Sequence, residues 1–294
     1  MADFIPMISI CPNKIVQYSV PAVPFTRSET QIAAEKFLTE AKKIEELSMK
    51  AKKRLTTAIW WLLSFADQKR VFVKKTGKHI NFKVGFVTLT LCSRQEHDDR
   101  IIKNVLLNQF FVEAKRLWDV KHFVWRAEPQ KNGNIHFHIL TDKFIPYWDL
   151  RKVWNRIQNK LGYVDRFQAN NGHDDPNSTD VHSVAKVKNV AAYLIKYFSK
   201  NSDARVLMGR LWVLSQSLSK MKNFTNEVTY QLSEDIETLT TFLKKEWYHG
   251  TYASVLFTHL LEIPQNITVE LLQKFQNYVK GWKAYFATGQ LSIV

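Results

Sequence analysis

The middle of the chain alternates between two hydrophobic periods. Residues 79–91 and 121–128 are rich in β-branched and aromatic side chains, a composition that predicts strands. Between them, residues 97–119 place apolar side chains at helical spacing. That helical stripe consists of Ile102, Val105, Leu106, Phe110, Ala114 and Leu117. This part of the chain is therefore predicted as strand, helix, strand.

The pattern continues to residue 200. Residues 132–140 predict a third strand after a turn, and residues 147–162 predict a helix that ends at Gly162. A polar loop, a short strand and an amphipathic helix follow, at 168–180, 180–184 and 185–200. The succession β-α-β-β-α-β is that of the split βαβ, ferredoxin-like antiparallel sheet, an α+β fold. In that topology the first and third strands lie at the centre of the sheet.

The two ends of the chain have a different pattern. Residues 1–27 contain four prolines and predict an extended arm, and residues 29–68 predict a helix that begins at a capping box of Ser28 and Gln31. Three later stretches predict helices, at 233–247, 253–262 and 268–288. We therefore predict three segments: an N-terminal arm and helical extension (1–78), an α+β domain (79–215) and a C-terminal helical extension (216–294).

His136 and His138 lie two residues apart in the third predicted strand, so their side chains project from the same face. Ile135, Phe137 and Ile139 project from the other face, which the pattern assigns to the core. A pair of neutral imidazoles can bind a metal ion. The alternative is a half-exposed strand that carries two histidines without a chemical role.

Glu128, on the neighbouring strand, could add a carboxylate, which favours hard divalent ions. A two-residue turn would pair Glu128 with Phe137 and direct the carboxylate into the core. A three-residue loop, residues 131–133, would instead pair Glu128 with His136. Because burial of an unpaired carboxylate is costly, we favour the three-residue loop. An exposed Glu128 without a metal is the alternative.

The last predicted helix carries two tyrosines beside its apolar face. The apolar face, which would pack on the sheet, consists of Val187, Val190, Ala191, Leu194 and Phe198. Tyr193 and Tyr197 lie one turn apart at the edge of this face, and polar residues share the same stripe, namely Lys186, Asn189 and Lys200. Lys196 lies further round the helix. Aromatic residues at such a border commonly only pack, so a structural role for both tyrosines is the alternative.

The composition indicates a polyanionic partner. The chain carries 42 Lys and Arg residues against 27 Asp and Glu, a formal net charge of +15, which favours nucleic acid or an acidic membrane surface. The most apolar run, residues 58–66, is far shorter than the roughly 20 residues of a spanning helix, and the N-terminus lacks the features of a signal peptide. Cys11 and Cys92 are far apart, which argues against a disulfide framework or a structural zinc site and is typical of a reducing cytoplasm.

In their order along the chain, these motifs resemble those of the HUH endonuclease superfamily. The closer resemblance is to the rolling-circle replication initiators of small single-stranded DNA phages and plasmids. Residues 86–91, FVTLTL, correspond to the first motif of these proteins, and residues 209–215 resemble a segment that follows their tyrosine helix. The histidine motif corresponds to His136, Phe137 and His138, and the tyrosine motif to Tyr193, Lys196 and Tyr197. The resemblance covers about residues 84–215, and tyrosines placed after the histidines distinguish these initiators from conjugative relaxases.

The resemblance implies that residues 79–215 are a catalytic domain that nicks single-stranded DNA at a replication origin. Mg²⁺ or Mn²⁺ would polarise the scissile phosphate, held by three side chains, His136, His138 and Glu128. A tyrosine would form a 5′-phosphotyrosine link and release a 3′-hydroxyl, so that the strands can later be rejoined without ATP. By its place in the motif, Tyr193 would be the first nucleophile of a two-tyrosine enzyme and Tyr197 the second.

Cations near the implied site would contact DNA. Lys196 is assigned to phosphate positioning or charge stabilisation, and three further residues to phosphate contacts, namely Arg126, Lys186 and Lys200. The sequence has no GxxxxGK[ST] motif, so the helicase, like the polymerase, would be a separate host or phage protein. The expected location is the cytoplasm of a bacterial host, without membrane attachment.

Two other classes of protein share parts of this pattern. An HxH motif with a carboxylate such as Asp142 also suits cupin-like metal oxygenases, but those are all-β jelly rolls and this chain is too helical. A non-catalytic nucleic-acid-binding module on a ferredoxin-like fold, as in RRM domains, stacks bases on sheet aromatics. Residues 84–91 lack that aromatic-rich pattern, and such a module has no use for a histidine pair. Lone histidines, His173, His182 and His249, are predicted as surface or packing residues.

Overall fold

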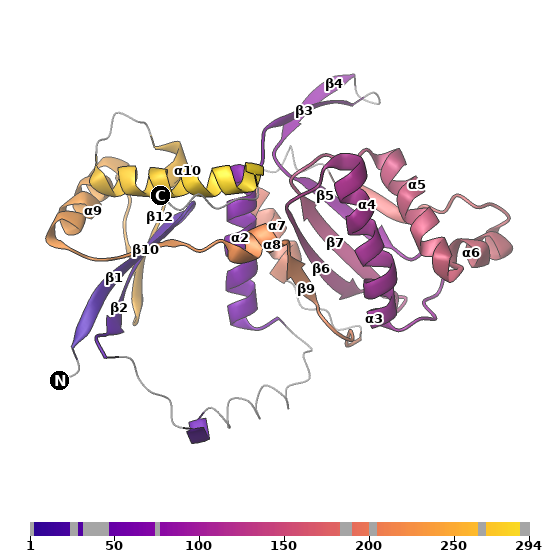
Figure 1. The fold of residues 1–294 in the computed structure, drawn as a ribbon, viewed down its shortest axis with the longest axis horizontal. Coiled ribbons are helices and arrows are strands. Elements are labelled where there is room, and N and C mark those ends of the chain that lie inside the picture. Colours follow the sequence, from indigo (N-terminus) through magenta and orange to yellow (C-terminus); the bar gives the residue numbers. More distant parts are fainter. Residues whose placement is uncertain are drawn as a thin grey trace. The chain divides into compact units, whose positions relative to one another are not determined.

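The computed structural model describes residues 3–23, 29–31, 47–73, 77–182, 190–199, 205–263 and 269–288. The chain divides into two compact units (Figure 1). The central unit comprises residues 44–219, and the terminal unit comprises residues 1–43 and 220–294. This division differs from the three consecutive segments that the sequence pattern predicts, because the terminal unit is built from both ends of the chain.

The central unit contains a five-stranded antiparallel sheet. Its strands are β5 (Gly85–Thr90), β6 (Phe123–Pro129), β7 (Ile135–Thr141), β8 (Thr179–His182) and β9 (Trp212–Leu214). They lie in the order β8-β5-β7-β6-β9. As predicted, the protein is α+β, and β5 and β7 are neighbours in the interior of the sheet. The sequence pattern does not predict β9, because three residues are too few to show a period.

Helices cover both faces of this sheet. Between β5 and β6 the chain forms α3 (Asp99–Ile101), the π-helical turn η1 (Ile102–Leu107) and α4 (Asn108–Trp118). Between β7 and β8 it forms α5 (Tyr147–Gln158), the 3-10 turn η2 (Asn159–Leu161) and α6 (Tyr163–Asn171). Two further helices, α2 (Met49–Phe65) and α7 (Val190–Ser199), lie on the other side of the sheet from α4 and α5 (Figure 1).

The hydrophobic core of the central unit lies between the sheet and helices α4 and α5. The fully buried side chains from these layers include Val87, Leu89, Phe110, Phe137, Ile139 and Trp154. Burial of each contributes roughly 1.5–3 kcal/mol. The indole nitrogen of Trp154 also donates a hydrogen bond of 2.7 Å to the carbonyl oxygen of Thr90. Because Phe137 occupies the core face, its neighbours His136 and His138 lie on the opposite face, as predicted.

Two helical segments differ from the sequence prediction. Val105 and Leu117 were expected in the apolar stripe, but their side chains are 40% and 45% exposed. The π-helical turn accounts for the position of Val105, because a turn with i→i+5 hydrogen bonds does not follow a period of 3.6 residues. Helix α6 occupies the beginning of the predicted loop at 168–180 and ends at Gly172, which has a φ of 75°.

Residues 79–91 form two strands and not the predicted single one. The chain forms β4 (Lys78–Phe82), bends at residues 83–84 and only then enters the sheet as β5. Strand β4 pairs with β3 (Lys69–Val73) in a separate two-stranded ribbon. Gly85 begins β5 at a point of close approach, where a Cβ atom would lie 2.6 Å from the carbonyl oxygen of Lys143. Glycine therefore lets the sheet start at this residue.

The terminal unit contains a second five-stranded antiparallel sheet, in the order β10-β1-β2-β12-β11. Its strands are β1 (Phe4–Cys11), β2 (Lys14–Pro21), β10 (Phe224–Glu227), β11 (Tyr248–His249) and β12 (Ala253–Phe257). Helices α9 (Tyr230–Leu243) and α10 (Glu270–Thr288) and the 3-10 turn η3 (Leu260–Glu262) complete its described part, and α8 (Gln216–Lys220) ends at the boundary with the central unit.

The predicted helical extensions are therefore corrected. Residues 4–21 form a paired hairpin and not an isolated arm, and residues 253–257 form a strand where a helix was predicted. A short apolar run does not distinguish strand from helix, and the pairing partner β2 lies at the other end of the chain. The helices predicted at 233–247 and 268–288 are confirmed as α9 and α10. Helix α2 belongs to the central unit and not to an extension.

Ser48 caps helix α2, because its hydroxyl oxygen accepts a hydrogen bond of 3.2 Å from the backbone nitrogen of Ala51. The predicted cap residue Ser28 lies outside the described residues. No helix in the described part of the chain is both long and apolar enough to cross a membrane.

Candidate active site

The register between β6 and β7 brings Glu128 to the histidine pair. Glu128 lies opposite His136, and Arg126 lies opposite His138. The connecting loop has three residues, 131–133, and Gly133 adopts a φ of 83°. The three-residue loop that the sequence analysis favours is therefore confirmed. Because side chains alternate along each strand, all four residues face the side of the sheet opposite the core.

The two imidazoles and the carboxylate contact one another. The ring centroids of His136 and His138 are 4.5 Å apart, and Nε2 of His138 lies 3.6 Å from Oε2 of Glu128. Within the described ranges, no group of three or more His, Cys, Asp or Glu side chains already has its donor atoms arranged around one metal position. The contact between His138 and Glu128 would therefore have to open for both side chains to bind the same ion.

The electrostatics favour the protonation states that a metal ion requires. Burial, assisted by the charge of His138, lowers the pKa of His136 to about 3, so this imidazole is neutral at physiological pH. Burial alone would raise the pKa of Glu128, but contacts with His138 and the Arg126 guanidinium outweigh burial and hold it below its usual range. A neutral imidazole beside an ionised carboxylate is a donor set for a divalent cation.

Two polar atoms of this group also lack a hydrogen-bond partner. Nδ1 of His136 and Oε1 of Glu128 are both buried without one. Oε1 of Glu128 lies 3.4 Å from the guanidinium of Arg126, at ion-pair distance. Buried polar groups without a hydrogen bond are uncommon in folded proteins, and an ion that is bound only in the functional state is one explanation. The residues present therefore fit a bound divalent cation.

Thr88 links His138 to a third histidine that the sequence analysis assigned to packing. The hydroxyl oxygen of Thr88 lies 3.3 Å from Nδ1 of His138 and 3.0 Å from Nε2 of His182. His182 also lies 3.3 Å from the carboxylate of Asp180. This chain of contacts fixes the orientation of the His138 ring. When Nδ1 of His138 donates its proton to Thr88, the lone pair on Nε2 is free for a metal ion.

Helix α7 places Tyr193 on the same face of the sheet. Its residues Ala191, Leu194 and Phe198 are buried, as the apolar stripe predicts. Tyr193 is half-buried, and its ring centroid is 6.4 Å from that of Phe86. Phe86 in turn lies 5.7 Å from the ring of His138 and 4.7 Å from that of His182. Phe86 therefore connects the tyrosine helix to the histidine strand, a role that the sequence analysis did not predict.

The other predicted site residues differ in how the structure places them. Lys196 is exposed on α7. Arg126 is only 5% exposed and forms an ion pair with Glu128, so its predicted phosphate contact stays a prediction. Three predictions fall outside the described part of the structure, namely the side chain of Tyr197 and the residues Lys186 and Lys200. His173 and His249 are exposed, as predicted.

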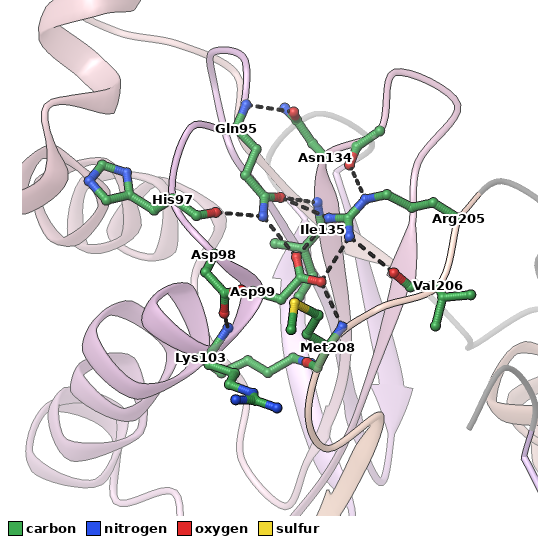
Figure 2. A network of polar contacts seen from close by, with 12 residues as sticks. Gln95, His97, Asp98, Asp99, Lys103, Asn134, Ile135, Arg205, Val206 and Met208 are labelled. Carbon is green, nitrogen blue, oxygen red and sulfur yellow. Dashed lines mark hydrogen bonds and ion pairs between the residues drawn. The ribbon is translucent and has the colours of Figure 1, made fainter. Parts of the chain in front are cut away.

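A buried ion pair anchors the chain segment that follows the tyrosine helix. Figure 2 shows the carboxylate of Asp99 at the centre of this network, where the two terminal nitrogens of Arg205 donate hydrogen bonds of 2.7 and 2.8 Å. Gln95 and the backbone nitrogen of Met208 donate two more. Arg205 also donates to the carbonyl oxygen of Gly133, in the loop between β6 and β7. The segment after α7 is thus held to the hairpin that carries Glu128 and His136.

Arg205→Ala should lower the free energy of unfolding by about 3–5 kcal/mol, because it leaves the Asp99 carboxylate buried without its charged partner. Asp99 is 2% exposed, so water replaces little of the lost contact. Urea unfolding followed by tryptophan fluorescence measures the change. Arg210→Ala, which removes an exposed arginine nearby, should alter stability by less than about 0.5 kcal/mol.

A loss as small as that of the Arg210→Ala control would contradict an anchoring role for Arg205. The pH dependence offers an independent check. Burial would raise the pKa of Asp99, but the hydrogen bonds from Arg205 and Gln95 outweigh burial and hold it below 3.8. The contribution of the pair is therefore fully present above pH 3.8 and is lost as the pH falls through the lower pKa of the folded state.

Comparison with known proteins indicates the class of this region. Residues 84–202 match a family model described as a replication-associated protein of the ORF2 type. Searches of curated proteins and of solved structures gave no significant match. The matched region contains the histidine pair, Glu128 and both tyrosines of the motif. It therefore indicates a replication-associated role for the central unit, with DNA as the partner.

Proposed function

We propose that the central unit is a replication initiator of the HUH type that nicks single-stranded DNA through a tyrosine nucleophile. The observation that carries this proposal is the convergence of three separate motifs on one sheet face. Strands β6 and β7 bring Glu128, His136 and His138 together, and Phe86 joins them to the helix that bears Tyr193. The strand order β8-β5-β7-β6 supports the ferredoxin-like assignment of this sheet.

His136, His138 and Glu128 would hold the divalent ion, Mg²⁺ or Mn²⁺, after the contact between His138 and Glu128 opens. The bound ion would supply Lewis-acid polarisation of the scissile phosphate. Arg126 would keep Glu128 ionised by its charge, and Thr88 would keep the His138 ring in place.

The proposed reaction is a transfer of one phosphodiester bond. The phenol of Tyr193 gives up its proton, and its oxygen attacks the phosphorus as the bond to the 3′-oxygen breaks. That 3′-oxygen takes up a proton, and the 5′-phosphate stays on the tyrosine. Attack by a 3′-hydroxyl reverses the step and rejoins the strand, with no ATP consumed. The exposed Lys196, three residues after Tyr193 on α7, would position the phosphate. Tyr197 would act as the second nucleophile.

The charge distribution supports DNA as the ligand of this unit. Residues 44–219 carry 30 of the 42 Lys and Arg residues but only 16 of the 27 acidic ones, a net charge of +14. The terminal unit is nearly neutral, at +1. Phosphate contacts would therefore come from the central unit, including Arg126, Lys186 and Lys200. The helicase and polymerase that extend the free 3′ end would be separate host or phage proteins, and the reaction would take place in the cytoplasm of a bacterial host.

The test is a nicking assay with a 3′-labelled single-stranded origin oligonucleotide from the replicon that encodes the chain. The expected product is a labelled protein–DNA adduct that survives a denaturing gel and forms only with a divalent ion present. Binding without any cleavage, with Mg²⁺ and Mn²⁺ both supplied, would overturn the nicking proposal. That result would favour the alternative function, a non-catalytic nucleic-acid-binding module on the same fold.

Thr88→Val should lower the affinity for Mn²⁺ by roughly 10- to 100-fold, the usual effect of removing a group that orients a metal ligand. Valine keeps the shape of threonine but cannot bond to His138 or His182. Isothermal titration of the protein with Mn²⁺ measures this loss. Thr88→Ser, which retains the hydroxyl, should bind Mn²⁺ almost as well as the wild type.

A matched control for Thr88→Val is available on the same strand. Thr90→Val removes a hydroxyl from the same sheet face, but that hydroxyl donates to the carbonyl oxygen of Ser178 and touches neither His138 nor His182. Equal losses of Mn²⁺ affinity in Thr88→Val and Thr90→Val would show that Thr88 has no specific role in orienting His138.

A further inference from the structure

The β3–β4 ribbon is a basic element of the central unit that the proposed nicking site does not use. Residues 69–83 contain six Lys and Arg residues and no Asp or Glu. Two of these, Lys74 and Lys75, lie outside the described residues at the tip of the ribbon. A segment with this composition favours contact with a polyanion.

The ribbon stands apart from the rest of the unit. Strands β3 and β4 pair only with each other among the described strands, and Figure 1 shows them projecting beyond the end of β5. The base of the ribbon is fixed by Phe82, whose ring centroid lies 5.6 Å from that of Phe144. An isolated two-stranded hairpin gains little stability from packing. Its exposed side chains therefore point to a function in binding.

Cross-strand pairing divides the side chains of the ribbon between two faces. Arg70 lies opposite Asn81, and Phe72 lies opposite His79. All four are exposed, Phe72 to 51%, and the rings of Phe72 and His79 are 5.1 Å apart. On the other face, the apolar side chains are half-buried, namely Val71, Ile80 and Phe82. The exposed face thus combines a guanidinium, an amide and an aromatic ring on one rigid strip.

We propose that this exposed face enters the major groove of duplex DNA that flanks the nicked strand. The major groove is about 12 Å wide and admits a two-stranded ribbon. Arginine pairs with guanine, asparagine pairs with adenine, and an aromatic ring contacts the thymine methyl group. Arg70, Asn81 and Phe72 supply these three groups side by side. Lys78 and Lys83, which are exposed at either end of β4, bind the phosphates that border the groove. The inference rests on the proposed function only for the choice of DNA as ligand.

The position of the ribbon is compatible with a duplex close to the proposed nicking site. Strand β4 passes through two residues into β5, and Thr88 on β5 contacts His138. From Gly85 to Thr88 the chain rises about 10 Å, at about 3.4 Å per residue. DNA held by the ribbon would therefore lie within about one helical turn, roughly 34 Å, of the histidine pair.

The test compares binding of the full chain to a fluorescein-labelled duplex of mixed sequence and to one of its single strands, by anisotropy. Arg70→Glu should weaken duplex binding roughly tenfold or more, and Phe72→Ala should weaken it by a smaller factor. The matched control is Arg116→Glu, which makes the same charge change at an exposed position on α4, and it should bind almost as the wild type does. A randomised duplex pool selected on the wild type should yield a preferred sequence that Asn81→Ala no longer selects.

Duplex binding by Arg70→Glu that equals binding by Arg116→Glu would overturn the proposal. So would an equal loss for the duplex and the single strand, because the ribbon would then contact a single-stranded backbone. Nicking by the wild type is measured in parallel on a single-stranded origin oligonucleotide. Its absence would contradict the proposed nicking function and leave the ribbon result standing, because that result is a measurement of binding.

Discussion

Tyr193→Phe should form the covalent protein–DNA adduct at least about 10³-fold more slowly than the wild type, because phenylalanine has no oxygen to attack the phosphate. The variant should fold and bind DNA normally, since the ring that lies beside Phe86 is retained. A 3′-labelled origin oligonucleotide and a denaturing gel measure the adduct. Tyr230→Phe, which alters an 80% exposed tyrosine of the terminal unit, should form adduct at the wild-type rate.

Tyr197→Phe tests the order of the two nucleophiles. We expect this variant to form the first adduct but to fail in repeated strand transfer. Adduct formation by Tyr193→Phe and not by Tyr197→Phe would reverse the order. Undiminished nicking by the double variant would exclude a covalent tyrosine mechanism.

His136→Ala and His138→Ala should each reduce nicking by roughly 10³-fold or more, because a metal ion supplies several kcal/mol of transition-state stabilisation. Binding of single-stranded DNA should change little, since it rests on phosphate contacts. Nicking is measured with Mn²⁺ and with a chelator, and Mn²⁺ binding is measured separately by electron paramagnetic resonance. The loss of nicking should match a loss of bound Mn²⁺.

His249→Ala is the control for these histidine variants, because His249 is exposed in the terminal unit. It should retain both nicking and Mn²⁺ binding. Full nicking by His136→Ala in the presence of chelator would show that the histidine pair is not a metal site. Unfolding is a minor concern for His136→Ala, because the native imidazole is neutral and its removal leaves no charge without a partner.

The parts of the site that the sequence predicts are those that depend on short-range rules. The period of two places His136 and His138 on one face, and the cost of burying Glu128 selects the register that the structure shows. The stripe of Ala191, Leu194 and Phe198 likewise predicts which side of α7 is buried. Each of these inferences needs only a few consecutive residues, or one tight turn.

The contacts that the sequence does not predict join residues far apart in the chain. Thr88 and His182 are 94 residues apart, and Asp99 and Arg205 are 106 apart. Alternation alone suggests that Thr88 shares a sheet face with Phe86, but strand order and register decide that His182 lies beside it. The ribbon and the terminal sheet were missed for the same reason, since each depends on strand pairing that no local period specifies.

The sequence order of the terminal unit has a consequence for synthesis of the chain on the ribosome. Met7 of β1 pairs with Glu227 of β10, so the contact closes a loop of 220 residues. The whole central unit, residues 44–219, is made within that loop. The β1–β2 hairpin emerges first but is marginally stable alone, and it can complete its sheet only when translation has passed β12. Domains generally fold as units while the chain is made, so the nascent protein acquires its histidine and tyrosine site before its two ends are joined.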